Sequence, residues 1–335
     1  MNQETQNEEA EVPKKQKRRF LKWLGRFVIL VIIFILVGAV YEPIAEKRDA
    51  KAHPPTGQMV DVGGYKLHIR CTGVGGPTVV IESGWGDFSS SWAWVQPEVA
   101  KTTRVCTYDR AGTGWSELSP EPRTARVFAR ELHTLLGKAG EAGPYVLVGH
   151  SLGGYTMRVY AHDYESEVAG LVLVDAQALP TKNIENPTPA PKPNKSSFPA
   201  WLARVGMARL LAGPLGAIRN LPAKDKSDYR AIAVTPRYVQ TFFDEGRGMS
   251  EGGAEARSVT TLGALPLIVL SRGKDQDAAW ATSQAEYLKL STNGQQVFAD
   301  KSGHEIMIEQ PEAAISSIIK MVEQVRSANQ KNIVQ

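Results

Sequence analysis

Residues 145–154, Tyr-Val-Leu-Val-Gly-His-Ser-Leu-Gly-Gly, form the stretch that decides the fold of this chain. A short apolar run leads directly into a G-x-S-x-G motif centred on Ser151, and residues that suit a helix follow it. A serine at so sharp a strand-to-helix turn has a strained backbone, which the flanking glycines make sterically possible. The turn lifts the hydroxyl out of the sheet and above a helix N-terminus. The pattern predicts Ser151 as a nucleophile, and the alternative is a glycine-rich turn with an exposed serine.

Short apolar or β-branched runs recur on both sides of this motif and alternate with helical patterns. An opening hairpin followed by this alternation predicts an α/β fold, with a mostly parallel sheet covered by helices on both faces. The clearest helical patterns are 126–138 and 312–325. The eight expected strands are 59–62, 65–71, 78–82, 104–108, 145–149, 168–175, 266–271 and 295–299.

The interval from about 177 to 262 contains no clear strand pattern. Six prolines crowd its first part, and 201–211 and 228–243 then have helical patterns. A segment this long inside a compact domain is more often a functional lid than a loop. We therefore expect a helical lid. Its apolar residues indicate an apolar pocket for the acyl or alcohol part of a substrate, and they suit ordinary packing of lid helices equally well.

Residues 27–41, FVILVIIFILVGAVY, form an unbroken apolar run near the start of the chain. The run is shorter than the roughly 20 residues that span a bilayer comfortably. Residues 23–25 extend it if the Arg26 side chain reaches back to the headgroups. We expect a transmembrane anchor over 27–46 that contacts membrane lipid. The alternative without a membrane is a buried core helix, but such a helix rarely follows a dense basic cluster.

The basic cluster before this run predicts the orientation of the anchor. Because lysine and arginine stay on the cytoplasmic side, residues 1–26 are expected to be a cytoplasmic tail and the rest of the chain to be exported. Residues 47–58 then read as a linker to a domain over 59–327. A secreted protein with a cleaved signal peptide is the alternative, since Val37-Gly38-Ala39 fits the small-residue cleavage rule.

A serine nucleophile needs a base, and position singles out one histidine among the six in the chain. His304 follows the last expected strand and precedes the C-terminal helical pattern. Loops at the carboxyl ends of parallel strands are where ligand sites of open α/β sheets gather. Taken alone, a loop histidine is more often a surface residue. The other histidines lie in the linker, within a strand, in helices or directly beside the serine: His53, His68, His133, His162 and His150.

The base in turn needs a carboxylate that holds its tautomer and stabilises its charged form. Asp175 ends the strand before the lid. The alternative to a catalytic role is a strand-end carboxylate that caps the next turn. Asp275 and Asp277 follow a later strand, 266–271. All three lie between the serine and the histidine, so each obeys the chain order Ser, Asp, His. The residues leave this choice open.

Two backbone N–H groups are also needed to stabilise the developing negative charge. One is expected from Leu152, the residue after the nucleophile. The other is expected from Trp85 in the loop 83–86, where glycines on both sides let the backbone approach a substrate. The alternative for that loop is a plain surface turn.

The chain resembles the α/β-hydrolase superfamily over roughly residues 59–327. The resemblance is strongest to its serine-nucleophile lipase/esterase, proline-iminopeptidase and haloperoxidase-like branch. It implies that Asp275 is the acid, because relatives place the acid four residues after the strand that ends at Ser271. Ser83 stands where most relatives carry histidine. The motifs that carry the resemblance are ESGWG at 82–86, YDRAGTGWS at 108–116, GHSLGG at 149–154, GH at 303–304 and QPE at 310–312.

The resemblance also implies a reaction. Relatives that open epoxides or remove halogens use an aspartate nucleophile, so a serine at 151 favours acyl transfer to Ser151 and then to water. Hydrolysis of a small-molecule carboxylic ester is the expected activity. The alternatives are an amidase or aminopeptidase, an acyltransferase, and an inactive binding module. No metal or cofactor is expected, and no nucleic-acid partner, because the net charge of +4 comes mainly from the basic cluster before residue 27.

Cys71 and Cys106 are the two cysteines of the chain. They are too few for a disulfide scaffold or a cysteine metal site. The sheet order of the resembled family places their strands side by side, and export would supply an oxidising compartment. A disulfide between them and two free buried thiols both fit this placement, and the choice stays open.

Overall fold

The computed structural model describes residues 14–180, 187–194, 197–211 and 220–334. Eight strands form one sheet in the order β1-β2-β4-β3-β5-β6-β7-β8. Strand β2 is antiparallel to both β1 and β4, and the remaining neighbours are parallel. The eight expected strands and the mostly parallel sheet are thus confirmed. The strands are β1 Gln58–Asp61, β2 Lys66–Thr72, β3 Thr78–Glu82, β4 Val105–Tyr108, β5 Tyr145–His150, β6 Val168–Val174, β7 Leu267–Arg272 and β8 Gly294–Ala299.

Apolar layers cover both faces of the sheet. In β5, Leu147 packs into one layer, whereas Val146 and Val148 pack into the other. Side chains alternate between the faces of a strand, so a central strand buried on both sides must be apolar throughout. This is why the run before Ser151 is unbroken. Helices α3 (Ala125–Ala139) and α4 (Gly153–Asp163) supply one layer, and α2 (Gln96–Val99) and α11 (Pro311–Val334) supply the other.

The structure settles the open question of the two cysteines: they form a disulfide. The antiparallel register of β2 and β4 sets Cys71 directly opposite Cys106. The Cα atoms of the two residues are 4.0 Å apart, and their sulfur atoms are bonded. The bond therefore joins the antiparallel strand β2 to the parallel part of the sheet.

The interval expected to be a lid contains four helices in its described part, whereas its described residues 177–180 and 187–194 are not helical. Two expected helices are each divided in two, at Gly206 (φ +78°) and at Thr235. Thr235 accepts a hydrogen bond from the backbone of Tyr238, and Pro236 begins the next helix. A capping threonine followed by proline starts a helix rather than continuing one, so the single helix expected over 228–243 was wrong. The helices are α5 Phe198–Arg204, α6 Met207–Leu211, α7 Ala223–Ala233 and α8 Pro236–Ser258.

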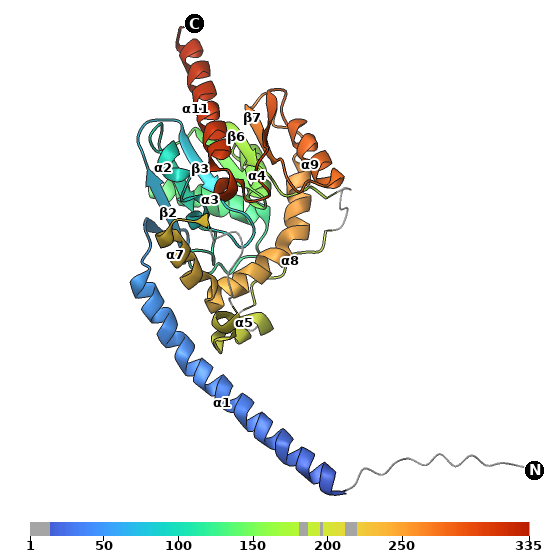
Figure 1. The fold of residues 1–335 in the computed structure, drawn as a ribbon. Coiled ribbons are helices and arrows are strands. Elements are labelled where there is room, and N and C mark those ends of the chain that lie inside the picture. Colours follow the sequence, from blue (N-terminus) through green and yellow to red (C-terminus); the bar gives the residue numbers. More distant parts are fainter. Residues whose placement is uncertain (1–13, 181–186, 195–196, 212–219, 335) are drawn as a thin grey trace, which may run out of the picture.

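A long N-terminal helix, α1, spans Lys14–Ala52 and extends away from the sheet (Figure 1). By length and composition it could cross a membrane, and its apolar part is almost wholly exposed. The expected tail lies partly outside the described residues, which begin at Lys14. The helix also runs through the first half of the expected linker. Only residues 53–57 separate it from β1, so α1 leads almost directly into the sheet.

Candidate active site

Ser151 lies in the sharp turn between β5 and α4. Its φ angle is +49°, a left-handed conformation that is uncommon for any residue except glycine. The turn leaves no room for side chains beside it: a Cβ atom at Gly149 would lie 2.5 Å from the Gly153 carbonyl oxygen. The serine is only 5% exposed, so the alternative of an exposed serine on a surface turn was wrong.

His304 lies in the loop between β8 and α10 (Ile306–Glu309), as expected. Its Nε2 atom is 3.0 Å from Ser151 Oγ. The two residues are far apart in the sequence, and the sheet brings them together because β5 and β8 end at the same edge. The Ser151 hydroxyl can therefore donate its proton directly to the imidazole.

The carboxylate beside His304 belongs to Asp175. Its Oδ2 atom accepts a hydrogen bond from His304 Nδ1 over 2.6 Å. Its other oxygen accepts from Trp280 Nε1 at 2.9 Å and from the backbone N–H of Arg272 at 3.2 Å. The Asp175 side chain is fully buried, so these donors replace its water. A carboxylate that holds Nδ1–H leaves Nε2 free to accept the serine proton.

The expectation that Asp275 faces the imidazole was wrong. Asp275 is exposed on the loop after β7, and the described part of the chain gives its carboxylate no hydrogen bond or ion pair. Asp277, the third candidate, accepts a hydrogen bond from the Trp280 backbone and caps α9 (Ala278–Leu288). Asp175 prevails because β6 is the direct neighbour of β5, so the end of β6 lies beside the serine turn. The order of the strands in the sheet therefore selects Asp175 over Asp275.

The loop 83–86 lies against the serine turn. A Cβ atom at Gly84 would be 3.1 Å from Ser151 Cβ, so this position must be glycine for the loop to come so close. Among the described residues, the backbone N–H groups of Trp85 and Leu152 have no protein acceptor. The Trp85 indole is held elsewhere: it stacks on Phe242 with ring centroids 4.4 Å apart. Two N–H donors beside the hydroxyl can stabilise an oxyanion.

A buried ion network holds this loop, and the sequence did not reveal it. Arg110 donates to the carbonyl oxygens of Ser83 and Gly84, both at 2.6 Å. It also pairs with Glu245 of the lid helix α8 at 2.7 Å, and Glu245 accepts from Gly86 N–H at 2.9 Å. Burial raises the pKa of Glu82, which also contacts Arg110, to about 7. Arg110 belongs to the motif at 108–116, which the sequence analysis identified. No sequence pattern pointed to Glu245.

His150, the residue before the nucleophile, supports the base. It donates from Nε2 to the backbone carbonyl of His304 at 3.0 Å. Burial lowers the pKa of His150 well below its usual value, and the neighbouring His304 adds to this effect, so the ring is neutral. It therefore acts as a fixed donor that positions the His304 loop.

Two groups of side chains have metal-ligand spacing within the described residues. In one, Cys71 and Cys106 are bonded to each other and cannot ligate an ion. In the other, His150, His304 and Glu305 lie together. Both ring nitrogens of His304 are already hydrogen-bonded, Nδ1 to Asp175 and Nε2 to Ser151. Neither group fits a metal ion without breaking bonds that the fold already makes.

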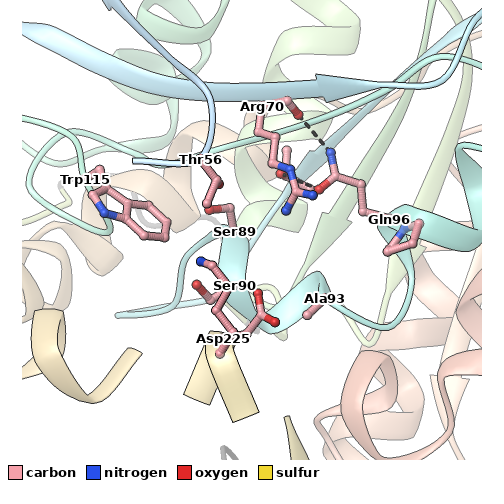
Figure 2. A pocket seen from close by; sticks show the side chains of 11 residues that line it. Thr56, Arg70, Ser89, Ser90, Ala93, Gln96, Trp115 and Asp225 are labelled. Carbon is pink, nitrogen blue, oxygen red and sulfur yellow. Dashed lines mark hydrogen bonds between the residues drawn. The ribbon is translucent and has the colours of Figure 1, made fainter. Parts of the chain in front are cut away.

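A separate cavity has a volume of about 190 Å³, and Figure 2 shows the side chains that line it. Arg70, Ser89, Ser90, Gln96 and Asp225 are among its lining residues, and Gln96 donates to the Arg70 carbonyl at 2.8 Å. Neither the serine nor the histidine of the candidate site lines it. The cavity is therefore separate from the place where the chemistry is expected.

Residues 79–317 match the model of the alpha/beta hydrolase family. An esterase from Thermogutta terrifontis is similar in structure: it is 25% identical with a TM-score of 0.58, over 80% of this chain and 97% of that one. A putative lipase from Acinetobacter baumannii AYE is 18% identical with a TM-score of 0.62, over 86% and 97%. The second likeness concerns the fold alone.

Among curated proteins, the uncharacterised YbdG of Bacillus subtilis is 22% identical over 90% of this chain and 97% of its own length. A probable transporter of Hormonema carpetanum, efuK, is 38% identical over 35% of this chain. An uncharacterised protein of Schizosaccharomyces pombe is 28% identical over 66%. The matches span only 18% and 42% of the lengths of these two proteins.

Proposed function

The chain belongs to the alpha/beta hydrolase family, and from that premise we propose that it is a membrane-anchored serine hydrolase that cleaves carboxylic esters. The observation that carries the proposal is the chain of hydrogen bonds from Ser151 through His304 to Asp175. This arrangement activates a hydroxyl for acyl transfer, and each member has the atom and the partner that its role requires.

In the proposed reaction, His304 Nε2 takes the proton of Ser151 as the serine oxygen attacks the ester carbonyl. The negative charge that develops on the carbonyl oxygen is stabilised by the N–H groups of Trp85 and Leu152, a contribution of about 10²–10³ in rate per donor. His304 then gives the proton to the leaving alcohol, and the acyl group stays on Ser151. Water, deprotonated by His304, then attacks the acyl carbon, and His304 returns this proton to the Ser151 oxygen as the acid leaves. Asp175 stabilises the imidazolium in both halves of the reaction.

Two observations support an ester as substrate. A serine nucleophile attacks acyl carbons, and the resemblance places an aspartate at this position in relatives that open epoxides or remove halogens. The similar structure from Thermogutta terrifontis is named an esterase. We therefore give ester cleavage precedence over amide cleavage and acyl transfer to another alcohol.

Labelling with a fluorophosphonate probe tests whether Ser151 is activated at all. We expect covalent modification of the full chain in detergent, because the probe reacts with a serine whose base is in place. A screen of p-nitrophenyl esters against aminoacyl p-nitroanilides should then give turnover with esters. Labelling with turnover of amides alone would overturn the choice of substrate, whereas an unlabelled protein would favour the inactive binding module.

The proposed anchor is α1. Its exposed apolar side chains and the basic residues before them suit a single crossing with the N-terminus in the cytoplasm. The small residues that fit a signal-peptide cleavage rule lie in mid-helix, and Gly38 contacts the carbonyl of Val205 in the lid. This packing supports a segment that stays part of the folded protein.

Protease added to intact cells should test this orientation. With an epitope tag at each end, we expect the C-terminal tag to be lost and the N-terminal tag to survive until the membrane is permeabilised. Loss of the N-terminal tag from intact cells would reverse the orientation. A mature protein whose sequence begins near Val40 would show that the segment is a cleaved signal peptide instead.

A further inference from the structure

Lid helices α5 and α6 carry large apolar side chains in exposed positions. Phe198, Trp201, Leu210 and Leu211, which we call the lid patch, are between 41% and 71% exposed. The rings of Phe198 and Trp201 stack on each other with centroids 5.9 Å apart. Apolar side chains gathered in this way mark a contact surface rather than scattered surface residues.

Helix α1 holds the lid patch in place. A Cβ atom at Gly38 would lie 2.1 Å from the Val205 carbonyl oxygen, so the backbone of α1 touches the turn between α5 and α6. On α6, Arg209 pairs with Glu42 at 2.8 Å and with Asp49 at 2.6 Å. Glu42 is 1% exposed, so this ion pair is largely shielded from solvent. The two lid helices and α1 therefore form one unit.

The contact with α1 sets the depth of the lid patch relative to the proposed membrane. Residues 23–41 rise about 27 Å as a helix, close to the roughly 30 Å of a hydrocarbon core. The outer boundary of that core then falls near Tyr41. Gly38 lies about 4.5 Å below the boundary, and apolar faces of interfacial helices enter a bilayer by about 5–10 Å. The lid patch therefore lies at the depth of the outer interface.

A series of packed elements joins the lid patch to Ser151. Helix α5 packs on α8, and Phe242 of α8 stacks on Trp85 in the loop beside the serine. Beside this contact, a groove of about 570 Å³ lies between α1 and the lid, at the depth of the outer interface. Much of its wall is apolar. Its apolar lining residues are Ala39, Pro43, Leu118, Trp201, Val205 and Pro236, and its polar ones are Glu42, Glu46, Arg204, Arg237 and Gln240. Figure 1 shows α5 between the sheet and the middle of α1.

We propose that the lid patch docks on the outer leaflet of the bilayer that α1 crosses, and that the substrate is an ester lipid that enters from this leaflet. The proposal rests on the function proposed for Ser151 and on α1 as an anchor. The bilayer is the occupant because the patch continues the apolar surface of α1, on which Tyr41 and Ile44 are exposed. Arg204, also exposed, lies in the groove wall where it can meet a lipid phosphate.

Photo-crosslinking tests the docking without reference to activity. The full chain, with Leu210 replaced by p-benzoylphenylalanine, is reconstituted into phosphatidylcholine vesicles and irradiated. We expect lipid adducts at position 210. The same replacement at Val74, which is 84% exposed on the α/β domain, should give none. Equal yields at the two positions, or adducts at neither, would overturn the docking.

Paired substrates test the route of the lipid. The variant Phe198→Ser/Leu210→Ser/Leu211→Ser should lose about tenfold or more in kcat/KM on a long-chain glyceride ester in vesicles, since each buried apolar side chain contributes that much. On soluble p-nitrophenyl acetate it should stay within about twofold, as surface changes do. The control Val74→Ser/Phe298→Ser changes two exposed apolar residues outside the lid and should retain both activities.

The outcomes separate this proposal from the proposed function. If wild-type protein cleaves the soluble ester but not the ester in vesicles, the lipid route fails and the esterase stands. If the lid variant loses both activities equally, the patch acts on the site itself and the docking proposal fails. If the wild-type protein cleaves neither ester and takes no fluorophosphonate, the proposed function fails first.

Discussion

The Ser151→Ala variant is expected to lose a factor of about 10⁴–10⁶ in kcat while it remains folded. The hydroxyl is the atom that attacks the carbonyl, and its removal leaves His304 with no proton to take. What activity remains would come from binding and from the two N–H donors alone. The measurement is kcat on a p-nitrophenyl ester, with thermal unfolding to show that the fold is intact.

Folding should survive this change because the serine side chain contributes one small hydroxyl to a strained turn. Alanine has the same difficulty as serine at φ +49°, so the backbone strain is unchanged. Ser317→Ala is a matched control. Ser317 is equally buried, but its hydroxyl bonds the Ala313 carbonyl within α11. The control should retain full activity, and turnover by Ser151→Ala within tenfold of wild type would remove the serine from the mechanism.

The second large effect is expected from Asp175→Asn, which should lower kcat by about 10⁴ near neutral pH. The amide is isosteric with the carboxylate, but its NH₂ group would face His304 Nδ1. The imidazole would then turn to the tautomer that carries its proton on Nε2, and this tautomer cannot accept the proton of Ser151. The buried imidazolium would also lose its counter-charge, since the Asp175 side chain is fully buried.

Asp275→Asn is the matched comparison. It makes the same change in chemistry on an exposed loop that follows the next strand, and we expect its kcat to stay within about threefold of wild type, as for other surface positions. Asp277→Asn should mainly affect the start of α9, where the side chain caps Trp280 N–H. If Asp275→Asn is the inactive variant and Asp175→Asn keeps more than a tenth of the activity, the assignment of the acid is wrong.

Local rules were enough to predict the serine turn and the histidine that lies beside it. A strand pattern, two flanking glycines and a helical pattern define the turn at Ser151 within ten residues, because they describe a conformation that few other sequences can adopt. His304 was found by elimination among six histidines and by its place after the last strand. The central strands were equally legible, because strands buried on both faces require nearly continuous apolar runs, whereas β1 and β8 at the edges are only partly buried.

The acid and the supporting residues depended on distances across the fold. Asp175 and Asp275 each follow a strand in correct chain order, and no local pattern separates them. The structure separates them because β6 is hydrogen-bonded to β5, whereas Asp275 stays on an exposed loop. Glu245 lies 135 residues from Arg110, so its part in holding the loop 83–86 could not be read from spacing.

The sequence by itself therefore determined the sheet, the serine turn, the histidine and an apolar N-terminal segment. These features depend on short-range periodicity, on turn chemistry and on composition. Only the tertiary structure decided which carboxylate meets the histidine, how Arg110 and Glu245 hold the loop 83–86, and that α1 packs on the lid through Arg209. The physical reason is that each of these contacts joins a buried carboxylate to a group on a distant segment. A buried charge requires a hydrogen-bonding or charged partner. The sequence does not show which segment supplies that partner.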